Sequence, residues 1–233
     1  MARLPRYNLP GITQHIIIRS LNRQPVFNCC QDYRYYQIRL SQSLQRHQCA
    51  LHAYVLMPDQ VQLLITPSSV DGIPKLVQML GRYYVQYFNK TYDRCGTIWE
   101  GRYRAAPVDT DNYLIQCCQY IETMPVLGGK AREISEYEWS SYRFHAGYCS
   151  DPLVTEHDIY RQLGMTGPER ATSYRMLCSR PMQQTLVQEI NCSIYNCWVL
   201  GSEAFKQRIA RIVCRRVSPL PRGGDRKSSC YRE

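Results

Sequence analysis

The sequence of 233 residues predicts an α+β fold, and two patterns lead to this prediction. Apolar and β-branched runs at 12–20, 51–58, 60–67 and about 102–108 have the composition and period typical of strands. Apolar residues three and four positions apart predict helices at 31–48, 71–92 and 112–123. Strand, helix, hairpin, helix, strand is the order of a ferredoxin-like antiparallel sheet with helices on one face, which leaves the other face free for a ligand.

Each element has a local reason. Ile16–Ile18 make the first strand β-branched, and a Pro58–Asp59 turn joins the two strands of the hairpin. A turn centred at that point places Val55 opposite Gln62 and His52 on the opposite face, and a slip of one residue in register would reverse this. We expect Thr110 or Asp111 to cap the helix 112–123, and Pro125 with Gly128–Gly129 to end it.

The chain changes character after about residue 163. Residues 133–163 predict an extension that wraps around the sheet domain, with Trp139 and Tyr142 as packing anchors. Beyond the Gly167–Pro168 linker, Leu186, Ile190 and Ile194 recur at helical spacing, and a second helix begins after a possible cap at Ser202. These two helices fit a helix-turn-helix or a plain helical hairpin. We therefore divide the chain into a domain at 1–163, a helical segment at 164–214 and a basic flexible tail at 215–233.

The charge of the chain points to a polyanionic partner. The formal net charge is +10, and from Lys206 onward nine basic residues face only two acidic ones. Nucleic acid is the commonest partner of such a tail, although a tail of this kind also serves solubility. Nineteen tyrosines against four phenylalanines suit stacking on single strands.

Other classes of protein are not favoured. No apolar run reaches the roughly 18 residues of a membrane span, and the N-terminus lacks the apolar core of a signal peptide. A cytoplasmic protein with neither membrane nor small-molecule partner is the expectation. The twelve cysteines contain no C-x-x-C pair, so we interpret them as ordinary thiols.

A candidate nucleophile lies on the helix 112–123. Tyr113, Gln116 and Tyr120 share one face of it, and Arg102 and Arg104 precede it on a strand. A tyrosine beside arginines could attack a phosphodiester if its proton were removed and the phosphate polarised, usually by a divalent cation. Taken alone, the pattern is more typical of packing.

Five ordered segments carry a family resemblance. They are PGITQHIIIRSLNRQ, LHAYVLMPDQVQLLITP, LGRYYVQYFNKTYDRCGTIWEGRYRA, YLIQCCQYIETMPV, and EWSSYR with the following D-P-L-V-T run. To about residue 163 the chain resembles the REP-associated tyrosine transposases, which are insertion-sequence-200-like, single-tyrosine HUH transposases. The resemblance implies DNA as the partner, as a hairpin or a single strand. It also implies that a tyrosine cleaves the DNA with the help of a divalent metal, Mg²⁺ or Mn²⁺. Whether the protein forms a homodimer stays open.

The resemblance also assigns residues. Tyr120 matches the nucleophile. Segments that resemble the DNA-facing ones contain Arg19, Arg23, Arg82, Arg102 and Arg104, and we add Arg215 and Arg216 from the tail.

The sequence departs from the family at the metal site. Gln60-Val61-Gln62 stands where the His-hydrophobic-His pair belongs, and Met124 stands where an amide ligand is expected. Leu127 replaces an arginine and Ser20 a glycine. Amide oxygens are weaker donors than imidazole, and hard cations avoid a thioether. We therefore expect DNA binding to persist and cleavage to be impaired.

Two alternatives stay open. One is an active transposase with a rebuilt metal site, and the other is a module that binds structured RNA. His52 lies on the neighbouring strand of the hairpin and His15 on the first strand, and we expect both to be hydrogen-bonded structural residues. Glu122 is expected to point to another side of its helix than Tyr120.

Overall fold

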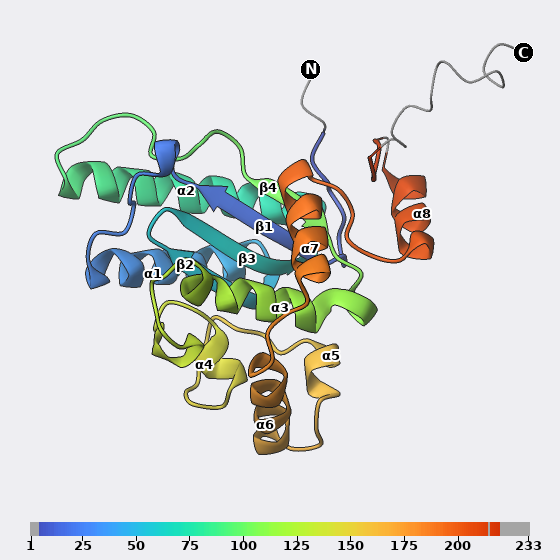
Figure 1. Ribbon diagram of the computed structural model, residues 1–233. Coiled ribbons are helices and arrows are strands. Elements are labelled where there is room, and N and C mark those ends of the chain that lie inside the picture. The colour runs from blue at the N-terminus through green and yellow to red at the C-terminus, as the bar shows by residue number, and fades with distance from the viewer. Residues whose placement is uncertain (1–4, 214, 220–233) are drawn as a thin grey trace, which may run out of the picture.

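The computed structural model describes residues 5–213 and 215–219 (Figure 1). Four antiparallel strands form one sheet in the order β2-β3-β1-β4, so β4 and β2 are its outer strands. The strands are β1 (Gln14–Arg19), β2 (Cys49–Met57), β3 (Gln60–Pro67) and β4 (Arg104–Pro107). The α+β fold is confirmed.

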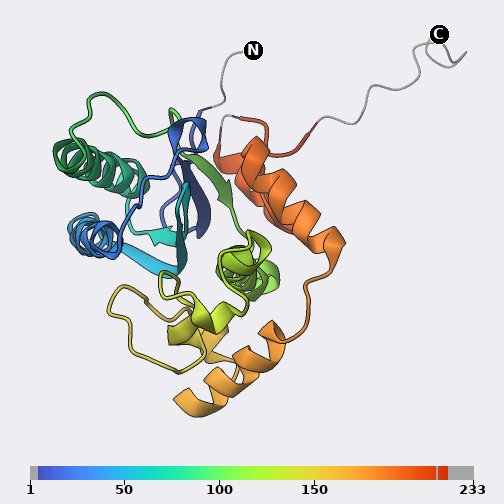
Figure 2. The same ribbon diagram turned by 60° about the vertical axis from the view of Figure 1, so that its left-hand side comes forward.

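Two long helices cover one face of the sheet, α1 (Cys30–Arg46) and α2 (Gly72–Thr91) (Figure 2). Strand residues alternate between the two faces, and on this face Ile16 and Ile18 belong to the main core. Tyr36 of α1 and Tyr84 of α2 pack edge-on at 4.9 Å within that core. The apolar stripes read from the sequence at 31–48 and 71–92 are thus the faces that the sheet buries.

The second face, expected to be free, carries two helices as well. These are α3 (Thr110–Leu127) and, from far along the chain, α7 (Gln184–Asn196) (Figures 1 and 2). Ile194 of α7 forms a small buried cluster with Ile17 and Ala106, which lie on neighbouring strands. The recurring Leu186, Ile190 and Ile194 predicted a helix, and the sheet supplies the surface that its apolar face meets.

The hairpin has the predicted register. Val55 lies opposite Gln62 and Met57 opposite Gln60. The register shifts between Leu51 and Ala53, so His52 stands at a β-bulge. The strand paired with β3 on its other side, β1, places Ile17 against Gln62 and Arg19 against Gln60.

The bounds of α3 differ from the expectation at both ends. Asp109 is the N-cap, not Thr110 or Asp111, and its carboxylate accepts hydrogen bonds from the backbone and side chain of Ser202. The helix also passes Pro125 and ends at Gly128, whose N–H donates to the Met124 carbonyl at 2.8 Å. Proline is tolerated there because it lies in the last turn, where the following glycine N–H groups satisfy the carbonyls.

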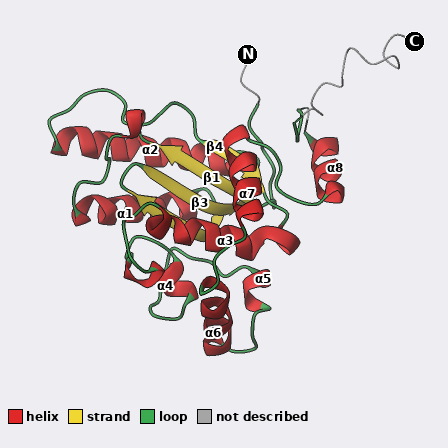
Figure 3. Ribbon diagram, viewed as in Figure 1, coloured by secondary structure: helices red, strands yellow, loops and turns green. Residues whose placement is uncertain are grey.

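Except for η1, which directly follows β1, the remaining elements wrap around α3 or lie beyond α7, and long loops, green in Figure 3, join them. They are η1 (Leu21–Arg23), η2 (Ile134–Glu136), α4 (Tyr142–His145), α5 (Asp158–Arg161), α6 (Gly167–Cys178) and α8 (Glu203–Ile212). Trp139 and Tyr142 are buried as predicted, and Trp139 stacks on Tyr33 with ring centroids 4.5 Å apart.

The predicted cap at Ser202 is confirmed, since its hydroxyl accepts from the Phe205 N–H. Gly201 precedes it because a Cβ there would lie 2.5 Å from the Cβ of Asp109. Of the predicted basic tail, residues 220–233 lie outside the described residues. Across the described helices, none has the length and apolar character to cross a membrane.

Candidate active site

Tyr120 points from α3 onto the second face of the sheet. It is 2% exposed, and its hydroxyl donates to Oδ1 of Asn191 on α7 at 2.8 Å. Its ring meets the ring of His15 edge-on, with centroids 5.8 Å apart. The candidate nucleophile therefore lies between a strand and helix α7.

The two glutamines lie on the same face of the sheet as His15. Gln60 and Gln62 are both buried, and Nε2 of His15 lies 2.8 Å from Oε1 of Gln62. An amide oxygen can only accept, so Nε2 of His15 donates and Nδ1 carries the lone pair. Within the described residues this Nδ1 has no hydrogen-bond partner. Tyr120 and Gln62, far apart in sequence, thus flank the same imidazole.

Burial shifts the pKa values of both His15 and Tyr120. Desolvation lowers the pKa of His15 to about 4, against a smaller opposing effect of the Gln62 hydrogen bond, so the ring is neutral at pH 7. Burial also raises the pKa of Tyr120 above the ordinary value of a phenol. A buried phenol hydrogen-bonded to an amide keeps its proton, while nucleophilic attack requires the proton to leave.

The divalent metal implied by the resemblance finds poor ligands here. Nowhere in the described ranges do three or more His, Cys, Asp or Glu side chains form a group able to hold a metal ion. The groups at the expected position are neutral amides, and Oε1 of Gln62 is already bound by His15. Arg19 lies directly opposite Gln60 on the neighbouring strand. Mg²⁺ prefers carboxylate and water oxygens and is repelled by a guanidinium, so the residues present do not fit this metal.

Helix α7 covers the rest of the site. The ring of Tyr195 lies under the Arg19 guanidinium at 4.2 Å, and Arg104 donates to the Tyr195 carbonyl. On the other side of α7, Tyr113 of α3 donates to Glu189 at 3.0 Å. The helix is therefore held to both α3 and the sheet by polar contacts.

Sequence reasoning did not find Asn191 and Tyr195. Asn191 is 71 residues from Tyr120 in sequence, and a single polar residue on a helix carries no signal that identifies its contact. The one available hint was the apolar stripe of α7, which shows that one of its faces must be buried.

The predicted DNA-binding arginines do not form one cluster. Arg19 and Arg104 lie together at Tyr195. Arg82 and Arg102 line a pocket on the α2 side of the sheet, and Arg102 also lines a second pocket with Arg104 and Arg215.

The other predicted residues lie apart from this site. Arg23 pairs with Asp59 at 2.8 Å, and Arg216 lies over the Trp198 ring. Arg215 lies over the Tyr7 ring and donates to the carbonyl of Cys197. Met124, one turn after Tyr120, is half-buried against the main core.

His52 and Glu122 have structural partners. His52 is bonded through one ring nitrogen to the Thr155 carbonyl and through the other to Thr66. Glu122 accepts from Ser141, His145 and Tyr174, on a different side of α3 from Tyr120. Both expectations for these residues are confirmed.

A similar solved structure supports the fold. Over 67% of its length the chain is similar to 99% of a REP-associated tyrosine transposase solved with a REP hairpin, at 14% identity and a TM-score of 0.51. A putative transposase from Deinococcus radiodurans R1 matches 53% of the chain with 97% of its own length, at 24% identity and a TM-score of 0.35. No curated protein matches.

The family follows from the sequence match. The model of the IS200-like transposases matches residues 8–124, half of the chain. This range includes β1 with His15, the hairpin with both glutamines, and α3 through Met124. It ends before α6 and α7. The chain belongs to the IS200-like transposase family, whose activity is DNA transposition.

Proposed function

We propose that this protein binds DNA as a hairpin or a single strand and cleaves it poorly. The observation that carries the proposal is the row Tyr120–His15–Gln62, in which the nucleophile position is retained beside an amide where the family has a metal-binding histidine. Cleavage requires an ionised phenol and a polarised phosphate. Here the Tyr120 hydroxyl is hydrogen-bonded to Asn191. The side chains at the expected metal-ligand positions are neutral amides, which polarise no phosphate by themselves.

The DNA-binding half of the proposal is supported by charge. Arg82, Arg102, Arg104 and Arg215 line two pockets that share Arg6, Arg102 and Tyr103. Arginines on adjoining surfaces position a phosphate backbone. The REP-associated transposase with the similar fold was solved with a REP hairpin, and we extend hairpin binding to this chain as part of the proposal.

Binding can be measured by fluorescence anisotropy with a labelled DNA hairpin that carries a single-stranded flank. We expect affinity to fall steeply with salt, and Arg104→Ala to weaken binding. The matched control is Arg161→Ala, an exposed arginine of α5 that pairs with Glu156. An unlabelled RNA hairpin of the same sequence that competes better than the DNA would favour the RNA-binding alternative.

Cleavage can be measured on the same DNA as a covalent adduct on denaturing gels with Mg²⁺ or Mn²⁺. We expect little or no adduct. Efficient adduct formation that Tyr120→Phe abolishes would contradict the proposal and would favour an active transposase with a rebuilt metal site.

A further inference from the structure

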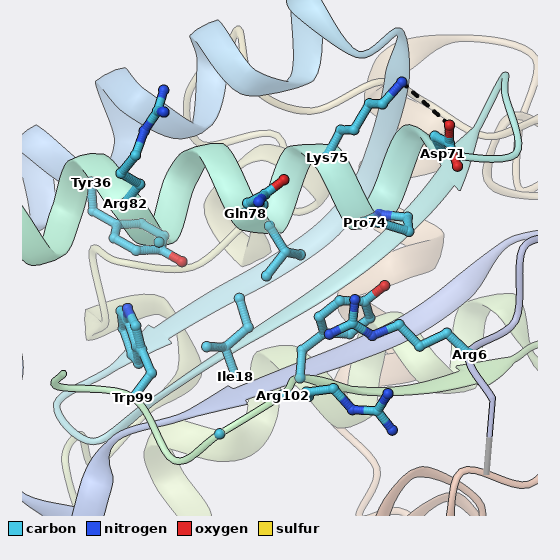
Figure 4. Close-up of a pocket in the computed structure, with 14 residues that line it drawn as sticks. Arg6, Ile18, Tyr36, Asp71, Pro74, Lys75, Gln78, Arg82, Trp99 and Arg102 are labelled. Atoms are coloured by element: carbon cyan, nitrogen blue, oxygen red, sulfur yellow. Dashed lines mark ion pairs between the residues drawn. The ribbon is translucent and has the colours of Figure 1, made fainter. Parts of the chain in front are cut away.

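A second candidate site lies on the opposite side of the sheet from Tyr120. It is a pocket of about 530 Å³ between α2 and the segment that leads into β4. Ile18 of β1, Tyr36 of α1 and Trp99 form its inner wall, and α2 forms the wall facing them (Figure 4). The volume lies within the range of about 300 to 1,000 Å³ that is typical of small-molecule sites.

The lining of this α2 pocket is basic. Four of its residues are cationic, and its one acidic residue, Asp71, is paired with Lys75 at 3.3 Å. Arg6 reaches the pocket from the N-terminal segment, and its guanidinium lies 4.4 Å from the centre of the Tyr103 ring. Charge of this sign favours a phosphate.

Three residues that line this pocket each carry a buried polar atom with no hydrogen-bond partner among the described residues. These atoms are the hydroxyls of Tyr36 and Tyr103 and Nε1 of Trp99, on side chains that are 0%, 9% and 8% exposed. Buried polar groups are rarely left unsatisfied, and several in one place call for an explanation. An indole N–H can only donate and a phenol can donate or accept, so these atoms match the acceptors on the edge of a base.

A second pocket continues this surface toward the candidate active site. It has a volume of about 200 Å³, shares Arg6, Arg102 and Tyr103 with the first, and is also lined by Arg104 and Tyr195. The two pockets meet at these shared residues beside β4, an outer strand whose C-terminal end is paired with the segment at Leu200. A nucleic-acid strand held in the α2 pocket would therefore have a basic surface leading toward the side of the sheet that carries Tyr120.

We propose that the α2 pocket binds one unpaired nucleotide, with its base at Trp99 and Tyr36 and its phosphate at Arg6. The proposal rests on the proposed DNA binding, and the nucleotide is then a residue of the single strand that flanks a hairpin. A free mononucleotide presents the same chemistry, and the experiment separates the two sources.

The test uses the full chain and three variants. Gly81→Leu fills the pocket, since a Cβ at Gly81 is 4.0 Å from the Trp99 ring and meets nothing closer. Tyr36→Phe removes only an unpartnered hydroxyl, so it should leave the melting temperature unchanged or raise it. The control is Gln86→Leu, at an exposed position of α2 outside the pocket.

Binding is compared for a hairpin with a single-stranded flank and the same hairpin without it. We expect the affinity ratio of the flanked to the unflanked hairpin to fall about tenfold in Gly81→Leu and Tyr36→Phe, with no change in Gln86→Leu. An unchanged ratio in both pocket variants overturns the assignment to a DNA strand, even if hairpin binding itself is intact.

A second experiment measures the melting temperature of the protein with and without free deoxynucleoside monophosphates. A rise in melting temperature that Gly81→Leu removes would assign the pocket to free mononucleotides, and it is informative even if the protein binds no DNA. If neither the flank nor any mononucleotide responds to Gly81→Leu, the pocket holds only water and the proposal is wrong.

Discussion

The hydroxyl of Tyr120 donates a hydrogen bond to Oδ1 of Asn191 at 2.8 Å, which joins the candidate nucleophile on α3 to helix α7. Asn191 in turn donates from Nδ2 to the Val187 carbonyl of its own helix, so its side chain is held at both ends. The family match ends at residue 124. The partner of the nucleophile therefore comes from a part of the chain beyond the matched range.

Replacing Asn191 tests this contact. Asn191→Ala leaves a buried phenol without its acceptor, which typically costs about 1 to 3 kcal/mol of the free energy of unfolding. Urea unfolding should show this loss, and amide hydrogen exchange in α7 should become faster. Asn196→Ala, at an exposed position of the same helix, is the control, and equal stabilities of the two variants would contradict the role of the contact.

Restoring the histidine pair tests the metal site. Gln60→His/Gln62→His should raise the affinity for Mn²⁺ by at least about tenfold, because imidazole is a better donor than an amide. Isothermal titration calorimetry measures this directly. A covalent DNA adduct should follow when Asn191→Ala is added, and Tyr120→Phe should abolish it. Metal binding without an adduct would instead indicate that Met124 and Leu127 also prevent cleavage.

The buried imidazole of His15 predicts a pH dependence. Above pH 6.5 it is neutral in both the folded and unfolded chain, so it does not affect stability there. Between pH 6.5 and about 4 the unfolded chain binds a proton that the folded protein does not. The free energy of unfolding then falls, by about 2 kcal/mol at pH 5. His52, whose pKa burial also lowers to about 4, acts in the same direction.

His15→Gln isolates this effect, because glutamine keeps a donor for Gln62 and has no proton to gain. Urea unfolding at pH 7 and pH 5 should show a smaller loss of stability in this variant than in the native protein. His47→Gln, at a less buried position near the end of α1, is the matched control. The same loss in native protein and His15→Gln would show that His15 does not titrate in this way.

Glu122 anchors the segments that follow α3. Its buried carboxylate accepts from His145 at 2.7 Å, from Tyr174 at 2.6 Å and from Ser141. Glu122→Leu leaves three buried groups unpaired, and we expect a loss of about 3 to 5 kcal/mol in thermal or urea unfolding. Glu138→Leu, at an exposed position, should be close to neutral, and similar losses in the two variants would refute the anchoring role.

The hairpin shows what local pattern can predict. The Pro58–Asp59 turn and the alternation of β3 predicted Val55 opposite Gln62, and the structure has this register rather than one slipped by a residue. The bulge at His52 was not predicted. It depends on the contacts of His52 with Thr155 and Thr66, and Thr155 lies 103 residues further along the chain.

The ends of α3 show the same limit. Asp109 is the cap, and its carboxylate accepts from Ser202, a contact that no local pattern indicates. The helix passes Pro125 because its last turn is closed by the glycines that follow. Sequence reasoning placed the middle of this helix and its tyrosine face correctly and misjudged both boundaries.

The sequence by itself determined the order of strands and helices, the facing pair Gln60 and Gln62, and the family to which the chain belongs. These depend on residues close together in the chain or on motifs in a set order. Only the tertiary structure decided that α7 covers the second face of the sheet and that Asn191 holds Tyr120. It likewise decided that one pocket is lined by Tyr36, Trp99 and Tyr103, whose polar atoms have no hydrogen-bond partner within the described part of the chain. The physical reason is that an apolar stripe specifies that a helix face must be buried, while the surface that buries it is set by packing between distant segments.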